Sequence, residues 1–313
     1  MLLPSTAQAA TLGGWNQREQ RAVAAAGVLP RLEDGRFHGE RPLTGAQLGA
    51  ALGALAARSG EPAIATSAST VVSVTTFDAR LVSQLGLADV AAHVQEVARA
   101  AGLHPPAVFG TEVVARFLGL RINHPAPDEK LELYPWDPIT RAEAAHSLAV
   151  VLAGGDWALD NARAQLSAFA LPAYGEAVRR ALSLAVSKIA MPYVWGGETD
   201  GISPGQVHGG YDCSGFVWRV FGPSVLGGRT TAARFAGAIP KSQRVRLEDV
   251  QPGDLLFFGS ASFDSKATER SIVHVGIALS PHWMIHSSAQ GVYVSSLDDP
   301  WRRDELAWAR RVL

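Results

Sequence analysis

The sequence predicts an α+β protein, with helical segments in the first half and an antiparallel sheet in the second. Apolar residues recur at helical spacing through residues 11–58 and again in the segment after residue 71. From Pro172 onward the chain is rich in aromatics, glycines and short alternating apolar runs, a pattern typical of strands. Because helices come first and the strands then follow one another directly, we expect antiparallel pairing.

The composition limits the possible partners and cofactors. The chain has 313 residues, 47% of them apolar and 18% charged, which is enough for two or three domains with cores of their own. A net charge of −1 gives no electrostatic reason to expect nucleic acid or an anionic membrane as a partner. No apolar run reaches 18 residues, so we expect no membrane span. A single cysteine excludes an internal disulfide and a multi-cysteine zinc site, and no metal or cofactor is expected.

The first ten residues end in Ala7-Gln8-Ala9, a small-x-small pattern like a secretory cleavage site. We interpret residues 1–10 as the remnant of a signal peptide, which predicts a secreted or cell-wall-associated protein. An ordinary alanine-rich leader is the alternative.

An internal repeat follows. Residues 42–47 (Pro-Leu-Thr-Gly-Ala-Gln) match residues 138–143 (Pro-Ile-Thr-Arg-Ala-Glu), and each segment leads into an apolar helical stripe. Thr44 and Thr140 are placed to cap these helices, and Thr140 with Glu143 has the spacing of a capping box. Small polar residues at 59–70 indicate a linker between the two copies.

Together with Asp89-Val90 and Ala101-Gly102-Leu103, these segments resemble S-layer homology repeats, over about residues 12–57 and 77–152. We assign the repeats to residues 11–60 and 71–153. The resemblance implies binding of a cell-wall polymer. Thr44-Gly45 lacks the arginine of the family motif, which puts ligand binding by the first copy in doubt. A capped helical pair without a ligand is the alternative.

The second half begins with a predicted helix over residues 174–190 that ends at Met191-Pro192. A glycine-rich loop leads to a second helix, from Cys213 to about Phe221. Pro252-Gly253-Asp254 has the composition of a turn that opens a buried strand. The strands are expected at residues 245–247, 251–258, 272–279 and 283–288.

Cys213 lies between Asp212 and Ser214 at the start of the predicted helix. Unpaired N–H groups and the helix dipole favour a negative charge there. A thiol in such a place can have its pKa lowered from about 8.5 into the range of roughly 3.5–7.5. We therefore expect a reactive thiolate, and a buried small hydrophobe is the alternative.

Two histidines follow on a predicted hairpin. If the bend lies at Ser280-Pro281, His274 and His286 are direct cross-strand neighbours, with Cβ atoms about 4.5–5.5 Å apart. This suits a base held by an orienting partner. His282 on the same face raises the alternative of a metal site, but no carboxylate lies at ligand spacing. His208 is an alternative base, in a loop that would position it poorly.

Five motifs in order resemble the NlpC-type peptidoglycan endopeptidases, which are papain-like cysteine peptidases, over about residues 174–313. The resemblance implies that Cys213 is the nucleophile, His274 the general base and His286 the third, orienting residue. The motifs are Pro192–Gly197, Tyr211–Val217, Pro252–Phe258, His274–Ile277 and Met284–Ser287.

The resemblance also implies further site residues and a reaction. Tyr193 corresponds to a tyrosine that contacts the nucleophile and helps the oxyanion site. The loop 198–210 is longer than is usual in the family, and we expect it to cover the cleft or narrow the substrate range. The expected substrate-binding residues are Asp212 and Ser214, which would hold a D-glutamyl group, with Arg229, Thr231 and Trp195.

The expected function is hydrolysis of peptidoglycan stem peptides between D-γ-glutamate and a diamino acid, through a thioester. Two alternatives stay open. One is an amidase or acyltransferase on the same scaffold, although the histidine precedes the cysteine in permuted lipid-acting relatives. The other is a wall-binding protein whose papain-like domain holds glycopeptide without cleaving it.

Overall fold

The computed structural model describes residues 15–66, 70–259 and 267–313. The proposed signal remnant at 1–10 and part of the proposed linker lie outside these residues. The chain divides into two compact units. The first unit comprises residues 1–92, 114–122 and 133–167, and the second comprises residues 93–113, 123–132 and 168–313.

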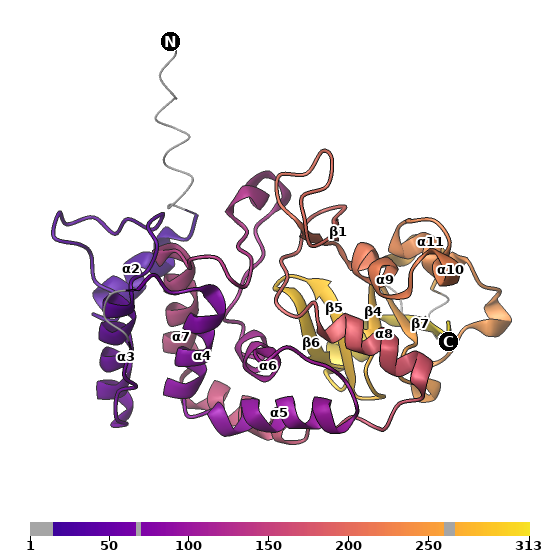
Figure 1. Cartoon of the computed structure of the whole chain (residues 1–313), viewed down its shortest axis with the longest axis horizontal. Helices are drawn as coiled ribbons and strands as arrows, with labels where there is room; N and C mark the ends of the chain where they lie inside the picture. Colours follow the sequence, from indigo (N-terminus) through magenta and orange to yellow (C-terminus); the bar gives the residue numbers. More distant parts are fainter. Residues whose placement is uncertain (1–14, 67–69, 260–266) are drawn as a thin grey trace, which may run out of the picture. The chain divides into compact units, whose positions relative to one another are not determined.

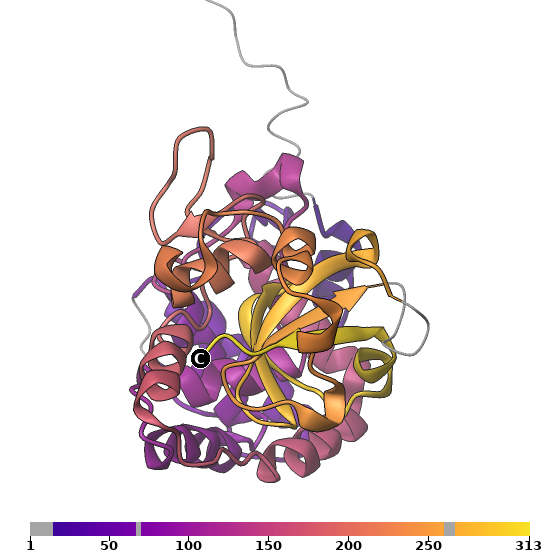
Figure 2. The same cartoon turned by 90° about the vertical axis from the view of Figure 1, so that its right-hand side faces the viewer.

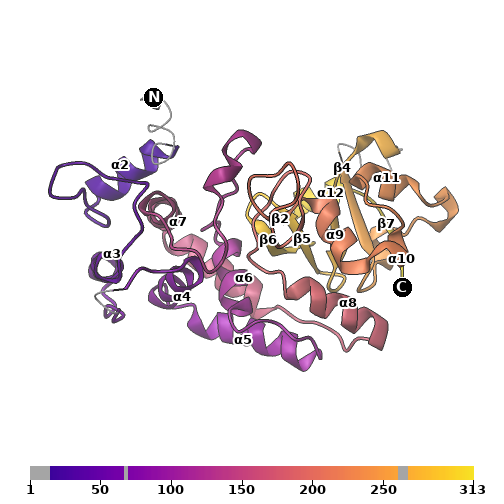
Figure 3. The ribbon, with the colours of Figure 1, turned by 45° about the horizontal axis from the view of Figure 1, so that its top comes forward.

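The first unit is helical, and α3, α4 and α7 run side by side in it (Figures 1 and 3). Helix α7 contains a kink at Gly155, where φ is 55° and ψ is −160°. The helices are α2 (Gln17–Ala25), α3 (Gly45–Ser59), α4 (Val74–Gln84) and α7 (Arg141–Ser167), with α5 (Ala88–Ala100) and α6 (Phe109–Phe117) crossing between the two units.

The predicted helix caps are present. Thr44 and Gln47 form a complete capping box at the start of α3, with bonds of 3.1 and 3.2 Å. The Thr140 hydroxyl accepts the Glu143 N–H at 3.2 Å at the start of α7. A third start of the same kind was not predicted: the Ser73 hydroxyl accepts the Thr76 N–H and caps α4. The sequence pattern concealed it because this copy has serine in place of threonine and no preceding proline.

The three segments before these helices are joined in a closed ring. Leu43 N–H donates to the Ile139 carbonyl at 2.8 Å, and Ile139 N–H donates to the Val72 carbonyl at 2.8 Å. Val72 N–H then donates to the Leu43 carbonyl at 3.2 Å. All three side chains are buried, so the ring forms the apolar centre from which α3, α4 and α7 start. The first unit is therefore built on three equivalent copies, whereas two were predicted.

The second unit contains a five-stranded antiparallel sheet in the order β6-β5-β4-β3-β7. The predicted succession of neighbouring strands is confirmed from β3 to β5. Two further strands were not predicted: β6 pairs with β5, and β7 returns to pair with β3 on its other side. A separate two-stranded ribbon lies before α9. The strands are β1 (Glu198–Thr199), β2 (Gly210–Tyr211), β3 (Leu255–Gly259), β4 (Ile272–Ala278), β5 (Trp283–Ser288), β6 (Gly291–Ser296) and β7 (Leu306–Arg310).

Helices cover the sheet, with α9 packed on β4 and β5 and α11 packed on β3 and β4 (Figure 2). This packing brings the start of α9 against the strand that carries His274. The helices are α8 (Glu176–Val186), α9 (Cys213–Phe221), α10 (Pro223–Leu226), α11 (Ala232–Gly237) and α12 (Pro300–Glu305), with short 3-10 turns η1 (Ala126–Leu131), η2 (Lys241–Gln243), η3 (Leu247–Asp249) and η5 (Glu269–Ser271).

Two predicted elements differ from the structure. The helix expected at 174–190 spans Glu176–Val186 and is followed by turns. At Ala190 the chain takes a left-handed φ of 70° and donates its N–H to the Val292 carbonyl on β6. The strand expected at 245–247 is a single bridge between Val245 and Ala309, followed by η3. Within the described residues, no helix has the length and apolarity needed to cross a bilayer.

Candidate functional site

Cys213 is the first residue of α9, and the preceding turn places it there. The Asp212 carboxylate caps the helix by accepting the Gly215 N–H at 2.6 Å, and Asp212 N–H donates to the Gly197 carbonyl at 3.0 Å. A Cβ atom on Gly215 would lie only 1.9 Å from that same carbonyl oxygen. Glycine at position 215 is therefore required for α9 to start against the Gly197 segment.

The Cys213 thiol is not ionised in the free site. Burial, and next the charge of Asp212, raise the pKa of this thiol to about 11. Hydrogen bonds from the N–H groups of Val275 and Ser214 act in the opposite direction but do not overcome burial. The prediction that the helix start lowers this pKa is therefore wrong, because desolvation of the thiolate outweighs the dipole.

The two histidines are diagonal neighbours rather than direct ones, so the predicted register is wrong. Strands β4 and β5 pair Ile277 with Ile285, which puts Gly276 opposite His286. The paired residues are symmetric about Pro281, whereas the prediction placed the bend between Ser280 and Pro281. The N–H groups of Leu279 and Ser280 both donate to the Trp283 carbonyl and close this turn. Gly276 has no side chain, and its position next to His286 leaves room for the diagonal contact.

The imidazoles nevertheless meet. His274 Nε2 lies 2.8 Å from His286 Nδ1, and His286 Nε2 lies 2.8 Å from Ser295 Oγ on β6. If His286 keeps its proton on Nε2 and donates it to Ser295, its Nδ1 accepts the His274 Nε2–H. That arrangement leaves His274 Nδ1 unprotonated and able to accept a proton.

Burial also keeps both imidazoles neutral. Desolvation, and next the charge of Arg302, lower the pKa of His274 to about 4. The pKa of His286 is lowered well below its usual value, chiefly by burial. Near neutral pH the free site therefore holds a neutral thiol next to a strand that carries a neutral, oriented imidazole.

Tyr193 belongs to the same group of residues. Burial is the main cause that raises the pKa of its phenol, with smaller electrostatic contributions from Cys213, Asp212 and Glu129. The phenol therefore keeps its proton across the physiological range and can donate a hydrogen bond.

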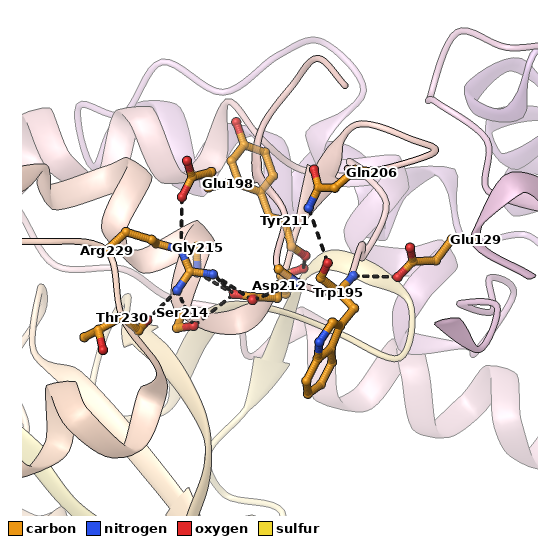
Figure 4. Close-up of polar contacts among 12 residues, drawn as sticks. Glu129, Trp195, Glu198, Gln206, Tyr211, Asp212, Ser214, Gly215, Arg229 and Thr230 are labelled. Atoms are coloured by element: carbon orange, nitrogen blue, oxygen red, sulfur yellow. Dashed lines mark hydrogen bonds and ion pairs between the residues drawn. The ribbon is translucent and has the colours of Figure 1, made fainter. Parts of the chain in front are cut away.

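Arg229 joins the residues on the other side of Asp212 (Figure 4). Its Nη2 lies 2.7 Å from both Asp212 carboxylate oxygens, and its Nη1 donates to Ser214 Oγ at 2.9 Å and to the Thr230 carbonyl. Glu198 Oε2 lies 3.3 Å from Nε. Ser214 Oγ in turn donates to Asp212 at 3.0 Å. The predicted substrate-binding residues Asp212, Ser214 and Arg229 thus form one charged network.

Trp195 and Thr231 have different surroundings. The Trp195 side chain is 71% exposed, and its backbone is held on both sides: its N–H donates to Glu129 Oε1 at 2.6 Å, and its carbonyl accepts from Gln206 Nε2 at 3.3 Å (Figure 4). Thr231 is exposed and caps α11. The Trp195 backbone is therefore fixed while its ring is exposed, and the Thr231 hydroxyl is engaged in capping α11.

The alternative histidine roles receive little support. His208 is buried, and its Nδ1 lies 2.7 Å from the Gly209 carbonyl. His282 is exposed and, contrary to the sequence reading, has a carboxylate nearby, with Asp298 Oδ2 at 2.9 Å from Nδ1. That carboxylate also pairs with Arg303, and no group of three metal-binding side chains occurs in residues 15–66, 70–259 and 267–313.

Comparison with known proteins agrees with this arrangement. Residues 190–311 match the profile of the NlpC/P60 family. These residues form an NlpC/P60 domain. The match contains Cys213, His274 and His286, together with the Asp212–Arg229 network, and excludes the whole first unit. The predicted S-layer homology of the first unit finds no counterpart among these matches.

The curated relatives of the NlpC/P60 domain carry peptidase names. A probable peptidoglycan endopeptidase, LytE, of Bacillus subtilis is 28% identical over 43% of this chain and 34% of its own length. A gamma-D-glutamyl-L-lysine dipeptidyl-peptidase of the same organism is 32% identical over 39% of this chain and 37% of its own length. The chain thus spans about a third of the length of these relatives. The crystal structure of the P60 domain of an antigen from M. avium subspecies paratuberculosis is 25% identical, covers 44% of this chain and 95% of its own, and has a TM-score of 0.34.

Three residues of the site escaped the sequence analysis. Ser295 could have been found from its place on the strand after His286, where alternate residues share a face. Glu198 was visible only as the first residue of the long loop. Glu129 precedes the matched residues by about 60 positions, and no local pattern connects it with Trp195.

Proposed function

We propose that the NlpC/P60 domain is a cysteine endopeptidase that hydrolyses peptidoglycan stem peptides, acting outside the cytoplasm. The observation that carries this proposal is the line of contacts from His274 through His286 to Ser295, on strands packed against the helix that starts at Cys213. His274 Nε2 lies 2.8 Å from His286 Nδ1, and the N–H of Val275, the residue after His274, acts on the Cys213 thiol. These contacts support the roles of nucleophile, base and orienter for Cys213, His274 and His286.

The reaction begins with transfer of the Cys213 proton to His274 Nδ1. The N–H groups of Val275 and Ser214 stabilise the thiolate that forms, and His274 Nε2–H keeps its bond to His286 as the ring becomes charged. The thiolate attacks the scissile carbonyl carbon to give a tetrahedral oxyanion. The Tyr193 hydroxyl and the Cys213 N–H serve as oxyanion donors, each worth about 2.7–4 kcal/mol in comparable sites.

Breakdown of the oxyanion releases the amine and leaves a thioester. His274 gives its proton to the departing nitrogen, so that the amine leaves neutral and His274 is again a base. Water, deprotonated by His274, then attacks the thioester and regenerates the Cys213 thiol. Because thiol and imidazole both start neutral, the proton moves during catalysis rather than before substrate binds.

The substrate group next to the scissile bond is proposed to be a γ-linked D-glutamyl residue, followed by a diamino acid. Asp212 and Ser214 flank the nucleophile at the start of α9, and Arg229, from the segment between α10 and α11, pairs with both, so that the group offers charged acceptors and donors. The name of one relative, a gamma-D-glutamyl-L-lysine dipeptidyl-peptidase, describes the same kind of bond. The exposed Trp195 ring is available for apolar contact with the peptide.

The test is mass spectrometry of defined muropeptides after incubation with the full chain, which also identifies the bond that is cleaved. Cys213→Ala and His274→Ala should each abolish cleavage while leaving the thermal unfolding transition in place. His282→Ala removes an exposed histidine of the same hairpin and serves as the matched control. Cleavage by Cys213→Ala, or products of acyl transfer or sugar-amide cleavage in place of peptide hydrolysis, would contradict the proposal.

For the first unit we propose attachment to a cell-wall polymer. The ring of three capped helix starts supports it, because it repeats one local structure three times around a centre. Arg141 is 1% exposed and donates to the Phe37 and Pro30 carbonyls, so ligand contacts must come from other side chains. Co-sedimentation of the Cys213→Ala chain with purified cell walls, before and after removal of the non-peptidoglycan polymer, tests this; equal sedimentation with both would contradict it.

A further inference from the structure

The pairing of β1 with β2 places Glu198 at the edge of the proposed substrate site. Glu198 is directly opposite Tyr211 in this ribbon, one residue before Asp212. Its carboxylate approaches the Arg229 guanidinium from a different side than Asp212 does, as Figure 4 shows. The ribbon continues into the long loop 200–209, which extends away from the sheet (Figures 1 and 2).

The guanidinium of Arg229 is consequently surrounded by two carboxylates. Arg229 Nη2 donates to both Asp212 carboxylate oxygens at 2.7 Å, and Arg229 Nη1 donates to Ser214 Oγ and to the Thr230 carbonyl. Nε is buried and makes no hydrogen bond of good geometry, because Glu198 at 3.3 Å acts only as a charge partner. One positive and two negative charges leave this part of the site with a net charge of −1.

A γ-linked glutamyl residue carries its α-carboxyl group close to the scissile bond. That group is either a free carboxylate or a carboxamide. A carboxylate next to the part-exposed Glu198 would be repelled by it, because the Arg229 charge is already compensated by Asp212 and Glu198. A carboxamide can instead donate a hydrogen bond through its nitrogen to the Glu198 carboxylate. The amide therefore pairs with Glu198 without adding charge.

We propose that Glu198 is a specificity-determining residue that favours α-amidated over α-carboxylate γ-D-glutamyl substrates. This rests on the proposed function, since it concerns the substrate of the same site. The half-exposed Glu198 is 37% accessible, whereas Asp212 is 14% accessible and caps α9. Glu198 can thus be exchanged without loss of the helix start, whereas Asp212 cannot.

The experiment measures kcat/KM of the full chain for two synthetic stem peptides that differ only in an α-carboxylate or an α-carboxamide on the γ-D-glutamyl residue. The wild-type chain should prefer the amide. Glu198→Gln should raise kcat/KM for the carboxylate peptide by about tenfold relative to the amide, which corresponds to about 1.4 kcal/mol. Glu248→Gln makes the same charge change at an exposed carboxylate that pairs with Arg246, and it should leave the ratio unchanged.

The outcomes separate the two proposals. If the chain cleaves neither peptide, the proposed function is rejected, and the specificity inference with it. If both peptides are cleaved but the ratio stays within twofold in Glu198→Gln, the inference alone is rejected. A wild-type preference for the carboxylate peptide would also reject it. Thermal unfolding of Glu198→Gln, expected at the wild-type temperature, verifies that the ratio reports on the site.

Discussion

The Glu129 carboxylate accepts the Trp195 backbone N–H at 2.6 Å, which ties a segment early in the chain to the loop that carries Tyr193. Glu129 is 9% exposed and lies on η1, about 60 residues before the residues that match the NlpC/P60 family. The segment is anchored a second time, where Asn123 N–H donates to the Ala289 carbonyl between β5 and β6 at 2.7 Å. A residue from outside the matched range 190–311 thus holds the backbone next to Tyr193.

Replacement of Glu129 tests that dependence. Glu129→Ala leaves the Trp195 N–H without its acceptor, and we expect kcat/KM to fall about fivefold, which corresponds to about 1 kcal/mol for one hydrogen bond. Glu129→Gln keeps an acceptor oxygen of the same reach and should retain most of the activity. Steady-state kinetics on one muropeptide compare the two variants. If Gln is as harmful as Ala, the charge rather than the hydrogen bond is what matters.

The histidine pair gives a graded prediction. His286→Ala removes the partner of His274 Nε2, and we expect kcat to fall on the order of 10²-fold or more, as for the orienting residue of other triads. Ser295→Ala removes only the bond to His286 Nε2 and should cost about fivefold. Ser288→Ala on the same hairpin serves as the control. Equal losses in the two site variants would show that the effect is structural rather than a matter of ring orientation.

Gly276 is required by the space between the strands. A Cβ atom there would lie 3.2 Å from His286 Cβ and 3.2 Å from Met284 Sδ. We expect Gly276→Ala to destabilise the domain by about 1–3 kcal/mol through overpacking, and to lower kcat by displacing His286. Gly201→Ala, where nothing lies within 4 Å, should change neither. Chemical denaturation and kinetics measure the two effects, and an unchanged kcat in Gly276→Ala would argue against tight positioning of His286.

Stability should depend on pH through the buried histidines. The folded-state pKa of His274 is about 4, below the unfolded value of about 6.5, so between these values the unfolded chain binds a proton that the folded chain does not. The stability is therefore complete above pH 6.5 and decreases as the pH falls toward 4. The slope is at most about 1.4 kcal/mol per pH unit for each such histidine.

Urea unfolding between pH 4 and 7 measures this slope. A His274→Asn chain should lose part of it, because asparagine does not titrate. His282→Asn provides the control, since that side chain is exposed. A slope that is identical in all three chains would show that neither histidine is held neutral by burial.

In the first unit, replacement of Arg141 should lower the stability of the fold strongly. Its guanidinium donates to the Phe37 and Pro30 carbonyls at 2.9 and 2.7 Å and lies 4.7 Å from the Phe37 ring centroid. Arg141→Ala leaves these buried acceptors unpaired, and we expect a loss of about 3 kcal/mol. Arg21→Ala, an exposed arginine on α2, should lose less than about 0.5 kcal/mol. A small loss of stability in Arg141→Ala would contradict this structural role and would favour a role in ligand binding.

Local rules predicted much of the architecture. Threonine three residues before a polar helix residue predicted the caps at Thr44 and Thr140, and Pro252-Gly253-Asp254 predicted the turn before β3. These features depend on neighbours within a few positions of the chain. Strand β7 and the third repeat at Ser73 were not predicted, because distant partners define them: β7 pairs with β3, more than 40 residues earlier, and the Ser73 segment is bonded to Leu43 and Ile139.

The sequence by itself determined the chemistry of this protein: one thiol after an aspartate, and two histidines on successive strands. Tertiary structure alone decided how these groups behave. The hairpin register depends on where the turn closes, which made His274 and His286 diagonal neighbours. The pKa of Cys213 depends on burial by residues from the whole domain, which reversed the shift that the helix start favours. Strand register and the burial of a side chain both depend on contacts with residues far away in the sequence. A local sequence pattern therefore cannot predict them.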